Sequence, residues 1–200
     1  ITANLSKCAE RLIAIGLGKF LACHGFGENQ WAYRAGRSSR DLLCLLVNTW
    51  LQFIFSGSKV AFYKSDITGA FDRVYTAFLL AKLRSLGIPT NIVDFLESYL
   101  APRTAHVAVG GTKSDDFCIA NSVYQGTVLG PMLWNTFFMD VSFAARSRGG
   151  TESVFADDLS VFKSFDRHDT EDRIIADMER TRKHVHAWGS RNRVSFDPAK

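Results

Sequence analysis

Two adjacent aspartates interrupt an otherwise apolar stretch in the last quarter of the sequence. Asp157 and Asp158 lie between the mainly apolar residues 153–156 and 159–162. This pattern predicts a buried hairpin over 153–162 with the two carboxylates at its turn. A buried carboxylate is costly unless a cation or another partner compensates its charge, and carboxylate oxygens suit Mg²⁺ or Mn²⁺. Because Asp also favours turns, an ordinary hairpin turn remains the alternative.

A third carboxylate far upstream is the candidate partner of this pair. Residues 60–64 form a short apolar run that predicts a central strand, and Asp66 follows it after one residue. Carboxylates from separate strands can hold two metal ions about 4 Å apart, which is the arrangement that phosphoryl transfer uses for positioning and charge neutralisation. We therefore expect Asp66 and Asp157 as bridging ligands and Asp158 as a second-site or orienting carboxylate.

The rest of the pattern predicts an α+β fold in which helices back one face of an antiparallel sheet. The helix over 41–55 is apolar on most sides and is expected to be buried, with Ser38 or Ser39 as its N-cap. Thr90 is a candidate cap for the helix over 91–100. Further helices are expected over 9–21 (broken near Gly16 and Gly18), 76–86, 132–145 and 169–188, a long-turned hairpin over 105–109 and 117–120, and a last strand over 194–196.

Composition limits the class of protein. With 46% apolar residues among 200, the chain can bury one core and a second small lobe, and the lack of an apolar run of eighteen residues argues against a membrane span. The formal charge of +4 is mild, so a nucleic-acid partner would need a local basic patch. Candidate patches are Arg34, Arg37 and Arg40, and the basic residues within 180–193, for which a solvated helix face is an equal alternative. The four cysteines lack metal-binding spacing and favour a reducing intracellular compartment.

Five segments, in order along nearly the whole chain, resemble motifs of reverse transcriptases of the non-LTR (LINE-like) retrotransposon class. Residues 30–38 (QWAYRAGRS) resemble the fingers motif Q-x-x-F-R-x-G-R-S, and 65–74 resemble the palm motif D-x-x-x-A-F-D. Residues 125–131 (QGTVLGP), 155–158 (FADD) and 188–200 resemble three further motifs of the family. Tyr124, Thr127 and Asp197 stand where the family commonly has Pro, Ser and Asn.

The resemblance implies a right-hand polymerase palm, an antiparallel ferredoxin-like sheet backed by helices, with partial fingers and no thumb. Residues 1–58 would be a fingers-like segment and 59–200 the palm, with a finger insertion around 88–122, in one continuous reverse transcriptase domain fragment. The ends at Ile1 and Lys200 are typical of a segment of a longer protein. We expect such a fragment to have weak or no processive activity by itself.

The resemblance also implies site residues. Asp66, Asp157 and Asp158 would be catalytic ligands of two Mg²⁺ (or Mn²⁺) ions, with the Ile67 carbonyl joining the first. Phe71, next to Ala70, would exclude a 2′-hydroxyl, although a plain core phenylalanine is its alternative. The other implied nucleotide-binding residues are Gln125 and Gly126 against the nucleotide and template, Arg34 and Arg37 as candidates for the triphosphate, and Lys200 for the departing pyrophosphate.

The implied function is RNA-directed DNA polymerase, transferring nucleotides from dNTPs to a DNA primer on an RNA template. Further domains of a parent polyprotein would be its partners, and the nucleus and cytoplasm its expected location. Two alternatives stay open: an inactive or degenerate fragment that serves as a nucleic-acid-binding scaffold, and a group II intron-type maturase. A nucleotide cyclase with a related palm would leave the Gln125-Gly126 loop unexplained.

Overall fold

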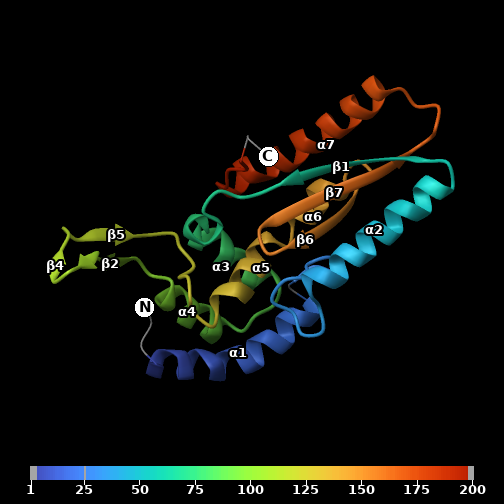
Figure 1. Cartoon of the computed structure of the whole chain (residues 1–200). Coiled ribbons are helices and arrows are strands. Elements are labelled where there is room, and N and C mark those ends of the chain that lie inside the picture. The colour runs from blue at the N-terminus through green and yellow to red at the C-terminus, as the bar shows by residue number, and fades with distance from the viewer. Residues whose placement is uncertain (1–3, 25, 198–200) are drawn as a thin grey trace.

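The computed structural model describes residues 4–24 and 26–197, which form helices around one three-stranded sheet and a projecting hairpin (Figure 1). The helices are α1 (Asn4–His24), α2 (Ser39–Phe55), η1 (Ala70–Arg73, 3-10), α3 (Thr76–Ser85), α4 (Thr90–Tyr99), α5 (Gly130–Phe138), α6 (Val141–Arg146) and α7 (Glu171–Asn192). The strands are β1 (Lys59–Ser65), β2 (Arg103–Ala105), β3 (Ala108–Val109), β4 (Thr112–Lys113), β5 (Phe117–Ile119), β6 (Thr151–Phe155) and β7 (Asp158–Phe165). None of the helices described is both long and apolar enough to cross a membrane.

The main sheet is antiparallel with the order β1-β7-β6. The aspartate hairpin is confirmed as β6 and β7, but its carboxylates are not buried as predicted, because Asp158 begins β7 with its side chain 42% exposed. The prediction of 60–64 as a central strand is wrong, because β7 is the middle strand and β1 lies at an edge. The apolar run in β1 has another cause. Phe62 stacks on Trp50 of α2 with ring centroids 5.4 Å apart, whereas the neighbouring Tyr63 hydrogen-bonds His186 of α7 at 3.0 Å. Both faces of β1 therefore meet a helix.

Helices lie on both faces of the sheet, so the prediction of one covered face is also wrong. Figure 1 shows β1 and β7 running between α7 on one side and α2 on the other. Leu159 and Val161 of β7 point to the core beneath α7 and are fully buried. Phe162 points the other way, where Trp50 meets its edge at 6.1 Å. The α2 face is covered only near Trp50, which leaves the end of the sheet that carries Asp158 open.

The core lies between the sheet and the helices α3, α5 and α7. Trp134, Phe137 and Phe138 of α5 are fully buried or nearly so. The predicted helix over 132–145 is two helices, because Asp140 turns away between them and accepts hydrogen bonds from Lys82 at 2.8 Å and Trp188 at 2.9 Å. These two bonds fasten the end of α5 to α3 and α7.

Two expectations about the N-terminal helices need correction. Helix α1 runs unbroken through Gly16 and Gly18, since burial of Leu17 and Leu21 outweighs a glycine cost of about 1 kcal/mol each. Helix α2 begins as predicted, because Ser38 caps it by accepting a hydrogen bond from the Asp41 amide at 3.2 Å. It is not buried, however, and Leu42 is its one buried residue.

The remaining elements differ from their predictions in detail. The predicted strand over 105–109 is split, so that β2 pairs with β5 and the short β3 and β4 close the tip of the projecting hairpin. Pro89, not Thr90, occupies the N-cap position of α4. Residues 194–196 contribute one antiparallel bridge, between Phe196 and Ile67, in place of a strand. Helix α7 buries residues of its C-terminal half, and Ile175 near its start is 61% exposed.

Candidate active site

The register between β1 and β7 brings two of the three predicted carboxylates to the same end of the sheet. Ser65 pairs with Leu159 as the last partners of the ladder, so Asp66 follows β1 directly beside Asp158 at the start of β7. Residues two apart in a strand share a face, so Lys64 and Asp66 lie on the same face. Asp158 lies beside Asp66 and belongs to this face too, which is the open one. The Lys64 ammonium lies 3.4 Å from the Asp158 carboxylate. A cation of the chain itself thus already accompanies one of these carboxylates.

Asp157 lies in the tight turn that joins β6 to β7. Phe155 pairs with Asp158, which leaves Ala156 and Asp157 as the two central residues of the turn. Ala156 has a positive φ of 59°, a backbone conformation that a residue with a Cβ rarely adopts. The surrounding structure must therefore hold this turn in place.

The side chains of Gln30 and Trp134 both hydrogen-bond the turn at Ala156. The Gln30 side chain accepts a hydrogen bond from the Ala156 amide at 3.1 Å and donates one to the Ala156 carbonyl at 3.2 Å. The Trp134 indole donates to the same carbonyl at 3.0 Å. Gln30 is 4% exposed, and its backbone runs beside β6, where Trp31 donates to the Val154 carbonyl at 2.8 Å. The fingers-like motif named Gln30, but nothing in the sequence assigned it this contact.

The end of β1 is tied to the C-terminal part of the described chain. The Asp66 carbonyl accepts a hydrogen bond from the Asp197 amide at 2.9 Å, and Ile67 forms its bridge with Phe196. The Asp66 carboxylate also accepts a hydrogen bond from the Ile67 amide at 3.0 Å. Ile67 itself is 2% exposed. Lys200, the predicted pyrophosphate residue, lies outside the described residues.

The carboxylates have the donor chemistry of a Mg²⁺ or Mn²⁺ site without forming a closed ligand cluster. Within residues 4–24 and 26–197, no three His, Cys, Asp or Glu side chains are grouped closely enough to hold a metal ion. Burial raises the pKa of Tyr33, and the negative charge of Asp157 raises it further. The oxygen donors and the ammonium of Lys64 beside Asp158 fit a site that accepts cations.

Ala70 and Phe71 lie in η1, shortly after Asp66. Ala70 is buried, and the partly buried Phe71 ring stacks on Trp134 with centroids 5.8 Å apart. The Phe71 carbonyl accepts a hydrogen bond from the Val123 amide at 2.8 Å, which fastens η1 to the segment before the Gln125 loop. Trp134 therefore contacts both the Phe71 ring and the turn that carries Asp157. A core phenylalanine and a nucleotide-facing one would both make this stack.

Gln125 and Gly126 are exposed at a turn just before α5. Gly126 has a φ of 76° with open space where a Cβ would stand, so its role here is the turn conformation. Below the turn, Glu10 of α1 accepts hydrogen bonds from the Val128 amide at 2.6 Å and the Leu129 amide at 3.2 Å. Glu10 is 3% exposed. No pattern in the sequence indicated this role, because an isolated acid in a mixed helix is typical of a surface position.

The two candidate arginines hold the loop in which they lie. Arg34 donates to the Gly27 carbonyl at 2.8 Å, and Arg37 donates to the Glu28 and Gln30 carbonyls at 2.5 and 3.0 Å. Burial, and then the charge of Arg37, lowers the pKa of Arg34. Through Gln30, this loop connects both arginines to the aspartate turn.

The reverse transcriptase (RNA-dependent DNA polymerase) family matches residues 1–200. A probable RNA-directed DNA polymerase from transposon X-element of Drosophila melanogaster is 32% identical over 86% of this chain, and the RNA-directed DNA polymerase from mobile element jockey of the same species is 34% identical over 69%. The chain spans 19% and 15% of their respective lengths.

Solved structures share the fold at low sequence identity. Apo telomerase from Candida tropicalis aligns with 98% of this chain and 36% of its own, with a TM-score of 0.63 and 9% identity. A form of it truncated from the C-terminal domain aligns with 90% of this chain and 36% of its own, with a TM-score of 0.54 and 13% identity. The chain thus shares its mixed helix and sheet fold with about a third of each of these two structures. With the whole sequence matched, the chain belongs to the reverse transcriptase (RNA-dependent DNA polymerase) family.

Proposed function

We propose that this chain carries the catalytic centre of an RNA-directed DNA polymerase of a non-LTR retrotransposon. The observation that carries the proposal is the register of β1 and β7, which brings Asp66 and Asp158 together on an open face with Asp157 in the adjoining turn. Relatives of this type are five to seven times longer than the matched segment, since the chain spans 19% and 15% of the two described above. The proposal therefore concerns the reaction at this centre.

Asp66, Asp157 and Asp158 are the proposed ligands of Mg²⁺ or Mn²⁺, with the Ile67 carbonyl as an additional oxygen. Bound divalent ions would activate the primer hydroxyl and neutralise charge on the leaving pyrophosphate. Gln30 and Trp134 keep the Asp157 turn in one conformation. The Lys64 ammonium, 3.4 Å from Asp158, would neutralise that carboxylate while no divalent ion is bound. The chain's own contribution is thus a rigid set of carboxylates at one sheet end.

The open face of the sheet is the proposed track for an RNA template and a DNA primer. Phe71 is the proposed wall against a 2′-hydroxyl, and the exposed Gln125-Gly126 turn is the proposed contact with nucleotide and template. Arg34, Arg37 and Lys200 remain proposed phosphate contacts. We assign 1–58 to fingers and 59–200 to palm, with the projecting hairpin inside the finger insertion around 88–122.

Single-nucleotide incorporation on an RNA template annealed to a DNA primer tests this function. With Mg²⁺ or Mn²⁺ we expect the unaltered chain to add a complementary dNTP, and Asp157→Asn or Asp158→Asn to lower the rate by about a hundredfold or more, since each removes charge from the metal ligands. Asp94→Asn, at an exposed position of α4, is the matched control. No incorporation by the unaltered chain, or equal rates in the Asn variants and the control, would contradict the proposal.

A further inference from the structure

A cavity of about 360 Å³ lies at the end of the sheet opposite the aspartates. Its floor is the C-terminal part of β7, and its walls come from α2, the turn before β6, and α7. Strand β7 is 8 residues long, so its two ends lie roughly 23 Å apart at about 3.3 Å per residue. The cavity is therefore separate from the candidate active site.

The cavity exists because β7 is longer than its neighbour β6. The last pair of that ladder is Thr151 with Phe162, whereas β1 accompanies β7 as far as Phe165. Within the described chain, residues 163–165 of β7 thus have a strand on one edge alone. The open edge faces the space between α2 and α7, and residues 163–165 line the cavity.

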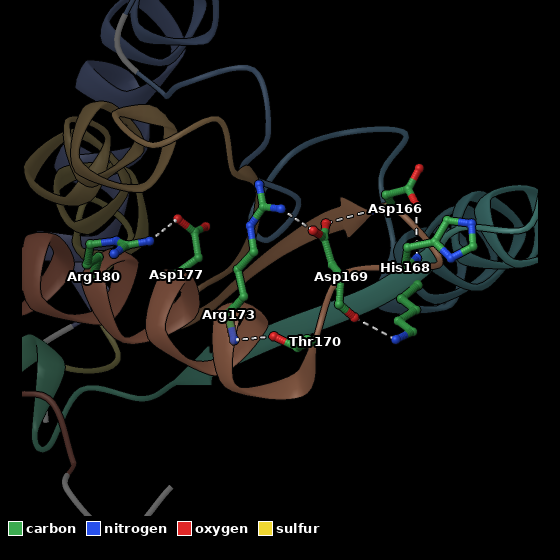
Figure 2. Close-up of polar contacts among 8 residues, drawn as sticks. Asp166, His168, Asp169, Thr170, Arg173, Asp177 and Arg180 are labelled. Carbon is green, nitrogen blue, oxygen red and sulfur yellow. Dashed lines mark hydrogen bonds and ion pairs between the residues drawn. The ribbon is translucent and has the colours of Figure 1, made fainter.

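Cationic side chains dominate the wall of this cavity. Arg148, Lys163, Arg173 and Arg180 line it against a single carboxylate, Asp177. The Asp177 carboxylate is shared between Lys163 at 2.7 Å and Arg180 at 3.1 Å, so one acid serves two cations. Figure 2 shows Arg180 turned to Asp177 and Arg173 turned to Asp169, which does not line the cavity. The lining therefore keeps a surplus of positive charge.

The same cavity is lined by aromatic rings. Phe53 of α2 and Phe165 of β7 are half-buried, and Phe162, which also lines the cavity, is 5% exposed. Arginines beside exposed aromatic faces are the combination that proteins use for unpaired nucleotides, because bases stack on rings while guanidinium groups grip phosphate oxygens. An isolated phosphate would use the cations and leave the rings without a role.

We propose that this basic aromatic cavity binds an unpaired segment of nucleic acid, with phosphates on Arg148 and Arg173 and a base against Phe53. The two arginines differ in their surroundings. Arg148 is exposed in the turn before β6. Arg173 is 73% exposed on α7 and forms an ion pair with Asp169, whose side chain is 11% exposed. Lys163, whose side chain is 5% exposed, supplies fixed positive charge from beneath. The site does not use the carboxylates of the candidate active site.

Binding of a labelled single-stranded oligonucleotide, measured by fluorescence anisotropy with EDTA present, tests the site without catalysis. We expect Arg148→Gln and Arg173→Gln each to weaken binding several-fold and to reduce the slope of log affinity against log salt by about 0.7, the value for one phosphate contact on a single strand. Arg167→Gln, which removes an exposed charge nearby but outside the cavity, is the matched control. Equal losses in Arg167→Gln and Arg148→Gln would overturn the proposal.

The aromatic contact has its own pair of variants. Phe53→Leu removes the ring from the cavity and is expected to weaken binding about tenfold, the usual effect of one stacked base. Phe55→Leu, two residues away at a position 83% exposed and outside the cavity, should change little. Equal effects of the two variants, or displacement of the oligonucleotide by inorganic triphosphate at the same concentration as by unlabelled oligonucleotide, would reduce the site to an anion pocket and overturn the proposal.

RNA and DNA oligonucleotides of one sequence, run in parallel, identify the strand that the cavity prefers. Single-nucleotide incorporation on a short primer hairpin separates this proposal from the proposed function. Arg148→Gln should keep the incorporation rate of the unaltered chain while binding is weakened. If the arginine variants lose oligonucleotide binding but no protein incorporates a nucleotide, the polymerase proposal alone is contradicted. If the unaltered chain incorporates a nucleotide but does not bind the oligonucleotide at the cavity, the cavity proposal alone is contradicted.

Discussion

At the scale of single residues, Gln30 forms two hydrogen bonds with the aspartate turn. Its amide satisfies both backbone groups of Ala156 across 126 positions of sequence, and it also accepts a hydrogen bond from the Ala32 amide at 3.0 Å. An alanine at position 30 would leave the Ala156 and Ala32 amides without this partner, and the Ala156 carbonyl with Trp134 alone. Asp157 would then lose the support that keeps its turn in the left-handed conformation of Ala156.

We predict that Gln30→Ala lowers the free energy of unfolding by roughly 1–3 kcal/mol, the cost of leaving buried polar groups unsatisfied. It should also lower nucleotide incorporation by more than its effect on the folded fraction explains, because the Asp157 turn loosens. Urea denaturation and single-turnover incorporation measure the two effects. Gln52→Ala, at an exposed position of α2, should stay within about 0.5 kcal/mol. If Gln30→Ala is as stable as the unaltered chain, the turn does not depend on the hydrogen bonds of Gln30.

Phe71 gives a second prediction at this scale. Phe71→Val shortens the side chain on the Trp134 ring, and a shorter wall should admit a 2′-hydroxyl. We expect the ratio of dNTP to rNTP incorporation to fall by about tenfold or more, in the range that one steric group in a pocket provides. The measurement is competitive incorporation of dCTP and CTP. An unchanged ratio with lower stability would identify Phe71 as a core residue alone.

At the scale of elements, local patterns in the sequence predicted which helices and strands form better than they predicted what surrounds each one. The aspartate hairpin and the helix over 76–86 were correct, because alternation and cap signals are local. The same signals could not show that β1 is an edge strand, since its apolar residues reflect two helices that come from distant positions. Helix α2 shows the same limit, because its apolar residues predicted burial although the described chain covers little more than Leu42 and the surroundings of Trp50.

Some residues of the candidate site were predictable from local motifs and others were not. The motifs found Asp66, Asp157 and Asp158, and the hairpin register explains why the first and last of these are neighbours. They could not find Glu10, whose partners are backbone amides 118 and 119 positions away. A contact to backbone leaves no residue-type signal at the partner position, so only the fold reveals it.

The link between β7 and α7 gives a pH-dependent prediction. The hydrogen bond from Lys163 lowers the pKa of Asp177 below its ordinary value. Burial opposes this effect, and the hydrogen bond from Arg180 adds to it. Because the pKa in the folded state is depressed, this carboxylate stabilises the fold above the pKa of the unfolded chain, and the contribution is lost as pH falls through the folded-state pKa. Asp177→Asn should therefore destabilise the chain at pH 7, and the difference should shrink below about pH 4.

Urea denaturation at pH 7, 5 and 3.5 measures this dependence, with Asp94→Asn as the exposed control. A difference between Asp177→Asn and the unaltered chain that stays constant from pH 7 to 3.5 would contradict an electrostatic link. It would leave shape, rather than charge, as the contribution of Asp177 to the packing of α7 on the sheet.

At the scale of the whole molecule, the long β1–β7 ladder separates two regions of different charge. The carboxylates gather at one end, where β1 stops and β7 starts, and the cationic cavity lies at the other. A nucleic acid that extends along the sheet would meet divalent ions at the first end and arginines at the second. The proposed reaction and the proposed cavity thus fit one elongated ligand, although each is tested by itself.

The exposed apolar side of α2 is the other feature of the whole molecule, and it predicts how the chain behaves in solution. Leu43, Val47 and Ile54 are 60%, 42% and 53% exposed, and Phe55 is 83% exposed. Several large apolar side chains on one helix form the kind of patch that promotes association between soluble proteins. We predict that Leu43→Gln combined with Phe55→Ser lowers the binding of a hydrophobic dye and lowers concentration-dependent association, as measured by light scattering.

Stability separates this surface effect from a change in the fold. Both side chains lie largely outside the core, so the double variant should keep the free energy of unfolding within about 1 kcal/mol, the sum of two surface substitutions. The paired control is Leu42→Gln, which places an amide at the one buried position of α2 and should destabilise the chain by more than that. If Leu43→Gln with Phe55→Ser unfolds the chain as Leu42→Gln does, the outer side of α2 contributes to the fold itself. If it leaves association unchanged, the patch does not govern the behaviour of the chain in solution.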